Sequence, residues 1–176
     1  AVMQNTDDGA MQLTTAQLNG FVFDYYGVPY NTLFFSTNAL ITFGSSDGSY
    51  INTNLTTNPN AATIAVYWDD LITRTAPNTV FWKVDGSGND QTLTIQWNRI
   101  DYYGNTGDPI TFQAVLHEAD GTIHINYQDL QSGIFSDDGR AATVGIKNSG
   151  SQGAQRLLVS QDSNTSPFVG TGKSLI

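Results

Sequence analysis

Two adjacent aspartates, Asp69 and Asp70, are the first residues of this 176-residue chain whose types and spacing suggest chemistry. They follow the apolar run 64–68 and precede Leu71 and Ile72. A glycosidase needs two carboxylates that face each other across a sugar, roughly 5 Å or 6.5–9.5 Å apart. Neighbouring residues of one strand point to opposite faces of a sheet, so these two alone do not form such a pair.

Two other interpretations of Asp69 and Asp70 stand. Calcium takes oxygen ligands from carboxylates and loop carbonyls, which makes the pair a candidate metal site. The structural alternative is that one aspartate accepts hydrogen bonds from backbone N–H groups where the strand ends, while the other faces water. The loop 85–90 and the segment 137–139 are weaker calcium candidates, because both are equally well explained as turns.

The two histidines, His117 and His124, lie in the segment F-Q-A-V-L-H-E-A-D-G-T-I-H-I-N-Y. Its alternation predicts a hairpin with the two-residue loop Asp120-Gly121, and in that register the histidines are cross-strand partners. Opposed histidines can bind zinc or titrate together near neutral pH. The sequence identifies no third zinc ligand, and the alternative is two polar residues on a solvated face.

Aromatic side chains are the candidates for contacts with a ligand. Tyr102 and Tyr103 follow a predicted strand, and we expect them in a loop where their rings are free to stack on a sugar. Phe81 and Tyr67 are weaker candidates for the same role. In a sandwich most aromatic residues fill the core, which is the expectation for Trp68, Trp82 and Trp97.

Composition excludes several classes of function. The net charge of −9 argues against nucleic acid and against anionic membrane surfaces as partners. There is no cysteine, which excludes disulfides and thiolate metal sites, and no apolar stretch approaches the roughly 20 residues of a membrane span. No nucleophile motif or phosphate-binding loop is present either. We therefore expect a secreted or cell-surface protein, plausibly bacterial, with no certain cofactor and calcium as the candidate ion.

The elements that position these residues are predicted to be strands. Fifteen of the sixteen acidic residues are aspartate, and the chain is rich in Gly, Asn and Thr, which favours turns over helices. Period-two alternation predicts one hairpin over 79–97 and a second over 112–127. We expect a single all-β domain over 1–176, an antiparallel two-sheet β-sandwich of jelly-roll or Ig-like type with eight to ten strands.

Several segments, taken in order, resemble the nidogen-like extracellular domains and related modules of bacterial surface and secreted proteins. They are F-F-S-T-N-A-L-I-T-F-G (34–44), I-A-V-Y-W-D-D-L (64–71), V-F-W-K-V (80–84), L-T-I-Q-W-N-R-I-D-Y-Y-G (93–104), I-T-F-Q-A-V-L-H-E-A-D-G-T-I-H-I-N-Y (110–127) and A-T-V-G-I-K-N (142–148). The resemblance covers about residues 20–150. Asn38-Ala39 departs from the Asn-Gly expected at that turn. The resemblance implies a β-sandwich without known catalysis that serves as one module of a larger adhesive or matrix-associated protein.

Three functions follow as expectations. The first is a non-catalytic extracellular module for binding or adhesion, with an extracellular glycan or a matrix or surface protein as its partner. The second is a glycoside hydrolase or lyase built on a jelly-roll sandwich, which needs carboxylates brought together from different strands. The third is a calcium-stabilised structural domain. The sequence does not identify the ligand.

Overall fold

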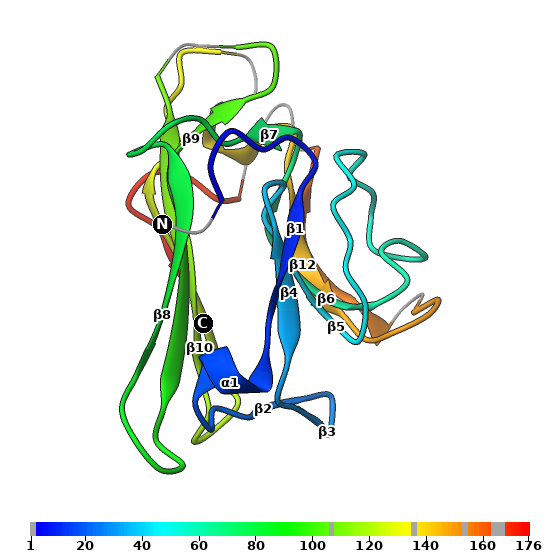
Figure 1. The fold of residues 1–176 in the computed structure, drawn as a ribbon. Coiled ribbons are helices and arrows are strands. Elements are labelled where there is room, and N and C mark those ends of the chain that lie inside the picture. The colour runs from blue at the N-terminus through cyan, green and yellow to red at the C-terminus, as the bar shows by residue number, and fades with distance from the viewer. Residues whose placement is uncertain (1–2, 106–107, 135–136, 153–154, 163–167) are drawn as a thin grey trace.

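The computed structural model describes residues 3–105, 108–134, 137–152, 155–162 and 168–176. Within these residues nearly all regular structure is β, and the strands form two layers that lie face to face (Figure 1). Every strand pair is antiparallel. The predicted all-β, two-sheet sandwich is therefore confirmed.

Each layer is a six-stranded sheet. The first has the order β1 (Ala10–Leu13), β4 (Leu33–Ser36), β5 (Leu40–Phe43), β6 (Ala62–Trp68), β12 (Thr143–Lys147) and β13 (Leu157–Gln161). The second has the order β14 (Ser174–Leu175), β11 (Ile123–Asp129), β10 (Ile110–His117), β9 (Thr92–Tyr102) and β7 (Leu71–Ile72), and β8 (Thr79–Asp85) also pairs with β9.

The remaining elements are short. They are the hairpin of β2 (Phe23–Tyr25) and β3 (Val28–Tyr30), the one-turn helix α1 (Thr15–Leu18) and the 3₁₀ turn η1 (Asp137–Gly139). The described residues thus contain fourteen strands, where eight to ten were expected. The extra strands are two to four residues long, too short for alternation to reveal them.

The main core fills the space between the sheets, and aromatic side chains of the second sheet form hydrogen bonds to the backbone of the first. Trp97 of β9 stacks on Phe112 of β10 with ring centroids 5.3 Å apart. The Trp97 indole N–H donates to the Ser36 carbonyl across the core, at 2.9 Å, and the Tyr127 hydroxyl donates to the Val66 carbonyl at 2.8 Å. These aromatic residues therefore bury large apolar surfaces while their polar atoms remain paired.

A second, smaller core lies on the outer side of the first sheet. The connection 44–61 folds over that side (Figure 1). Trp68 packs there with Leu40, Leu55 and Ala65, and its indole N–H donates to the Ser49 carbonyl at 2.7 Å. Trp97 belongs to the main core as predicted, whereas Trp68 belongs to this outer cluster and Trp82 is only partly buried.

The first predicted hairpin is confirmed, and its register pairs Val80 with Trp97 and Val84 with Leu93. The register of the second is wrong by two residues. Leu116 pairs with Ile123 rather than Ile125, and Ala114 with Ile125 rather than Tyr127, so the loop has four residues, 118–121.

Contacts to other elements explain the longer loop of the second hairpin. The Glu118 N–H donates to the Gln91 carbonyl at 3.0 Å, and the Glu118 carboxylate accepts from the Val22 N–H at 2.9 Å. These bonds draw Glu118 out of the ladder. A shift of two residues preserves the face of each side chain, so the predicted faces remain correct.

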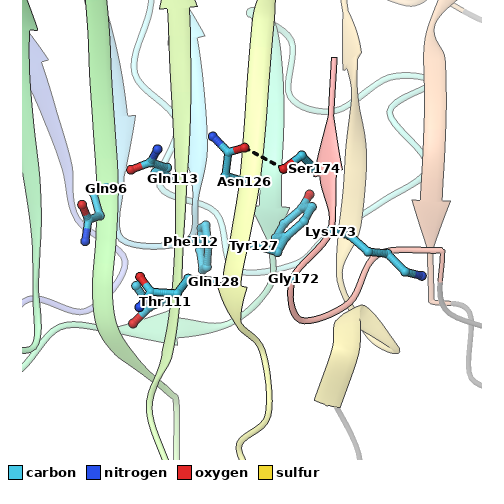
Figure 2. Close-up of a pocket in the computed structure, with 10 residues that line it drawn as sticks. All are labelled: Gln96, Thr111, Phe112, Gln113, Asn126, Tyr127, Gln128, Gly172, Lys173 and Ser174. Carbon is cyan, nitrogen blue, oxygen red and sulfur yellow. Dashed lines mark hydrogen bonds between the residues drawn. The ribbon is translucent and has the colours of Figure 1, made fainter.

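Among the described residues, no such connection covers the outer face of the second sheet, which presents polar side chains, including Gln96, Gln113 and Asn126 (Figure 2). The turn at Asn38-Ala39 forms without glycine, because Ala39 itself takes the left-handed conformation, with φ +59°.

Candidate functional site

Asp69 and Asp70 follow directly after β6 and do not share a site, because Asp70 clusters with Asp7 and Asp8 and Asp69 does not. Their backbone bends between β6 and β7, and the Asp70 N–H donates to the Asp69 carboxylate at 2.8 Å. This hydrogen bond agrees with the structural interpretation of the pair, in which one aspartate accepts from a backbone N–H group where the strand ends. Asp70, in contrast, points to the N-terminal segment of the chain.

Asp69 is directed into the protein. Its second carboxylate oxygen is buried and has no hydrogen-bond partner among the described residues. Burial, with a contribution from the nearby carboxylates of Asp70 and Asp162, raises the pKa of Asp69 from 3.8 to about 6. The carboxylate therefore carries its charge at neutral pH at a cost in stability.

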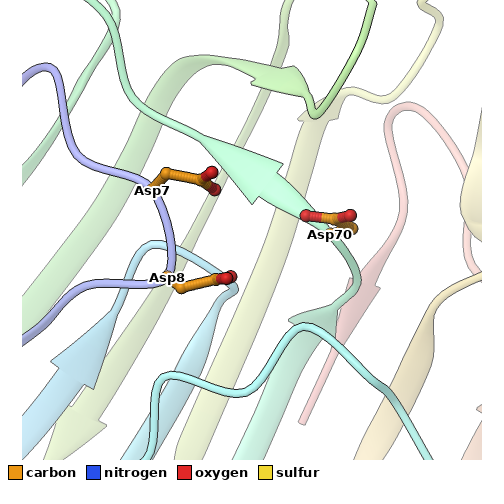
Figure 3. Close-up of side chains that lie close together, drawn as sticks. All are labelled: Asp7, Asp8 and Asp70. Atoms are coloured by element: carbon orange, nitrogen blue, oxygen red, sulfur yellow. The ribbon is translucent and has the colours of Figure 1, made fainter.

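Asp70 meets Asp7 and Asp8 at one end of the sandwich (Figure 3). One carboxylate oxygen from each of the three lies within 4.8 Å of the others. Burial and the neighbouring carboxylates raise the pKa of Asp70, and the same two causes raise the pKa of Asp7. Oxygen atoms this close can share one cation, because calcium binds oxygen at 2.3–2.6 Å.

Hydrogen bonds to β7 fix the segment that carries Asp7 and Asp8. The Thr73 N–H donates to the Thr6 carbonyl at 3.0 Å, and the Thr6 N–H donates to the Thr73 hydroxyl at 2.9 Å. The Asn38 carboxamide donates to the Asp8 carboxylate at 2.7 Å. These bonds place three carboxylates together from chain segments more than sixty residues apart.

Two exposed tyrosines complete the site. Tyr50 and Tyr103, 48% and 58% exposed, line one hollow of about 230 Å³ together with Asp7, Asp8 and Asp70. The Tyr103 N–H donates to the Asp70 carbonyl at 2.9 Å, which ties the tyrosine to the acidic residues. We call these five residues the acidic–tyrosine pocket.

The expectation of a loop position holds for Tyr103 but is wrong for Tyr102. Tyr102 is the last residue of β9, is only 5% exposed, and its hydroxyl lies 2.6 Å from that of Tyr67. A ring buried in this way is not available to stack on a sugar. Tyr67 is likewise fully buried.

The other candidates lie elsewhere and remain apart from this pocket. The exposed Asp85 and Lys83 of β8 form an ion pair at 2.5 Å, and Asp138 accepts a hydrogen bond from the Thr171 N–H at 3.2 Å. The ring centroids of His117 and His124 lie 4.5 Å apart, with the ring planes tilted by 46°. The two residues are diagonal neighbours rather than direct partners, because His124 pairs with Val115.

Sequence reasoning missed three members of the acidic–tyrosine pocket, Asp7, Asp8 and Tyr50. The only local signal was the pair Asp7-Asp8 before Gly9, which indicated no more than a turn. Nothing in the spacing connects residue 7 with residue 70, since a pairing between segments of this separation exists only in the folded chain.

Comparison with known proteins gives the family. The family model described as NIDO related matches residues 1–174, nearly the whole chain. The chain belongs to the NIDO-related family, and this confirms the nidogen-like resemblance. A search of curated proteins and a search of solved structures each found no match.

The family assignment supports the coarse expectation of an extracellular module. Among the described residues, no helix has the length and apolar character required to cross a bilayer.

Proposed function

We propose that this domain is a non-catalytic extracellular module that binds carbohydrate in the acidic–tyrosine pocket. The observation that carries the proposal is the meeting of two exposed tyrosine rings and three carboxylates in one hollow of about 230 Å³. Family membership supports the extracellular setting.

The chemistry of the pocket suits a sugar. Carboxylate oxygens accept hydrogen bonds from hydroxyl groups, and hydrogen bonds to a charged acceptor are stronger than those between neutral groups. The rings of Tyr50 and Tyr103 offer apolar surface beside these acceptors, against which the C–H face of a pyranose can pack. The backbone around the pocket is held by hydrogen bonds, so little ordering is required when a ligand binds.

The test is a glycan array probed with the intact domain and two variants. Tyr50→Ala combined with Tyr103→Ala should abolish binding to the glycans that the wild-type domain binds. Tyr26→Ala is the matched control, because Tyr26 is 42% exposed and lies in the turn between β2 and β3, away from the pocket. Binding that survives in the double variant, or no glycan binding by the wild type, would refute the proposal.

Calcium binding is a second candidate, favoured because one oxygen from each of the three carboxylates lies within 4.8 Å of the others. A cation held there would relieve the repulsion among Asp7, Asp8 and Asp70. A ligand that binds only the native state raises the melting temperature, so calcium should stabilise the wild type relative to a chelator. Asp8→Asn should lose most of that increase, and an unchanged wild-type melting curve would remove this candidate.

Glycoside hydrolysis is the remaining candidate function, and the cluster of Asp7, Asp8 and Asp70 is where its two carboxyl groups would lie. The three carboxylate oxygens lie within 4.8 Å of one another, near enough for two of the carboxyl groups to act on one glycosidic bond. The raised pKa of Asp7 and Asp70 is the direction that a general acid needs. A reducing-end assay on each glycan that the array identifies separates the two functions. New reducing ends that disappear in Asp70→Asn would establish an enzyme in place of a binding module.

A further inference from the structure

A straight row of uncharged polar side chains crosses the open face of the second sheet. In the strand register, Gln113 of β10 lies between Gln96 of β9 and Asn126 of β11, and Asn126 lies beside Ser174 of β14. Figure 2 shows these four side chains on successive strands. Neighbouring strands lie about 4.8 Å apart, so the row extends roughly 14 Å perpendicular to the strands.

Phe81 of β8 extends the row at one end. It pairs with Gln96, and its ring is only partly buried. The four polar side chains of the row also line one shared hollow of about 200 Å³, and Lys173 lines it beside Ser174. An aromatic ring, three carboxamides and a hydroxyl therefore follow one another across five strands.

The row has unused hydrogen-bonding capacity. The Gln113 carboxamide makes no hydrogen bond within the part of the chain that the structure describes. Asn126 uses its side-chain oxygen to accept from the Ser174 hydroxyl at 2.7 Å, which leaves its NH₂ group free to donate. A carboxamide offers a donor and an acceptor together, and this matches a hydroxyl group, which also has both.

The charge of the row is also informative. The protein has a net charge of −9, yet none of the five row residues is ionisable, and the charged residue that lines the hollow is Lys173. Lys173 already donates to the Phe168 carbonyl at 2.8 Å. An uncharged strip on an acidic protein suits a neutral ligand, because an anionic one gains no counter-charge along the strip and is repelled by the protein as a whole.

We infer that the row from Phe81 to Ser174 is a second binding site, for a neutral linear polysaccharide that lies across the strands. Phe81 packs against a sugar ring at one end, and Gln96, Gln113 and Asn126 bind successive hydroxyl groups. The site shares no residue with the acidic–tyrosine pocket, which lies at the end of the sandwich, so it stands whether or not that pocket binds carbohydrate.

The experiment is affinity electrophoresis of the intact domain through gels that contain hydroxyethyl cellulose, galactomannan or laminarin, with polygalacturonate as the acidic comparator. Gln113→Ala combined with Asn126→Ala should weaken binding to the neutral polymer that retards the wild type about thirtyfold, because two hydrogen bonds of on the order of 1 kcal/mol each are lost. Gln161→Ala, an exposed glutamine on β13 of the other sheet, is the matched control and should bind as the wild type does.

A second variant keeps the test decisive if the double variant folds poorly. Gln113→Lys places a longer, charged side chain in the middle of the row and should block binding while circular dichroism and the melting temperature stay unchanged. Tyr50→Ala with Tyr103→Ala should leave retention by the neutral polymer intact, which distinguishes this site from the acidic–tyrosine pocket.

Three results would overturn the inference. They are no retention by any of the three neutral polymers, equal retention by polygalacturonate, and undiminished retention of well-folded Gln113→Lys.

Discussion

The side-chain amide of Asn38 donates a hydrogen bond of 2.7 Å to the carboxylate of Asp8, thirty residues earlier in the chain. The same amide group donates to the Gly48 carbonyl at 2.8 Å, and the Asn38 side-chain oxygen accepts from the Leu71 N–H at 2.7 Å. One fully buried side chain therefore joins the N-terminal segment, the connection 44–61 and the start of β7. It fixes where two of the three clustered aspartates lie.

Asn38→Ala should destabilise the domain by about 2–4 kcal/mol, because it removes three hydrogen bonds and leaves the buried Leu71 N–H without a partner. Urea unfolding at pH 7 measures the change. Asn38→Asp is the informative comparison, since it keeps the acceptor for Leu71 but sets a fourth carboxylate beside Asp8. A loss below 0.5 kcal/mol in Asn38→Ala would contradict this account of the residue.

Asp69→Asn should make the domain more stable at neutral pH. With the pKa of Asp69 raised from 3.8 to about 6, the native state binds more protons than the unfolded state between these values, so the free energy of unfolding falls as the pH rises through this window. A shift of two pKa units corresponds to about 3 kcal/mol, which is the upper limit of the gain. Asparagine keeps the acceptor for the Asp70 N–H and carries no charge.

Unfolding free energies at pH 4 and at pH 7 test the Asp69 prediction. The variant should resemble the wild type at pH 4 and exceed it at pH 7. Parallel pH profiles for the two proteins would show that Asp69 ionises in the native state as easily as in the unfolded chain.

Asp70→Asn should raise the melting temperature in calcium-free buffer of low ionic strength, because it removes one of three mutually repelling charges. The gain should shrink in about 1 M salt, where the Debye length is about 3 Å. Asp90→Asn, which removes one negative charge from the exposed loop between β8 and β9, is the control and should change the melting temperature less. A decrease in both proteins alike would argue against repulsion in the cluster.

Mutation of Tyr102 should destabilise the domain, whereas mutation of the adjacent Tyr103 should not. Tyr102→Phe should cost about 0.5–1.5 kcal/mol, because it removes the buried contact between the Tyr102 and Tyr67 hydroxyl groups. Tyr103→Ala should leave the unfolding free energy within about 0.5 kcal/mol of the wild type, because its ring is exposed. Chemical denaturation of the two variants side by side gives both values, and equal losses would mean that Tyr103 also packs in the folded protein.

The fold was predictable where a pattern repeats over many residues. Alternation along β8 and β9 predicted this hairpin correctly, because each arm has seven or more residues of consistent period. The register of β10 with β11 was not predictable, since it depends on bonds from Glu118 to Val22 and Gln91, neither of which lies in the hairpin.

The candidate site was only half predictable for a related reason. Asp70 and Tyr103 stand out in the sequence beside a strand end, whereas Asp7, Asp8 and Tyr50 acquire their position from the tertiary contacts of Asn38 and Trp68. The alternation of apolar and polar residues also does not reveal where a strand ends. β9 continues through Tyr102 and carries that ring into the interior, one residue before the chain becomes exposed.

The fold of the connection 44–61 over the first sheet makes the two flanks of the sandwich unequal (Figure 1). The connection 44–61, which packs on Trp68, covers the outer face of the first sheet, whereas the described residues leave the outer face of the second sheet open. A domain of this kind, when bound to a partner, would present two chemically different outer faces. Consecutive copies on one chain would need a particular rotation between them for the open faces of their second sheets to point the same way.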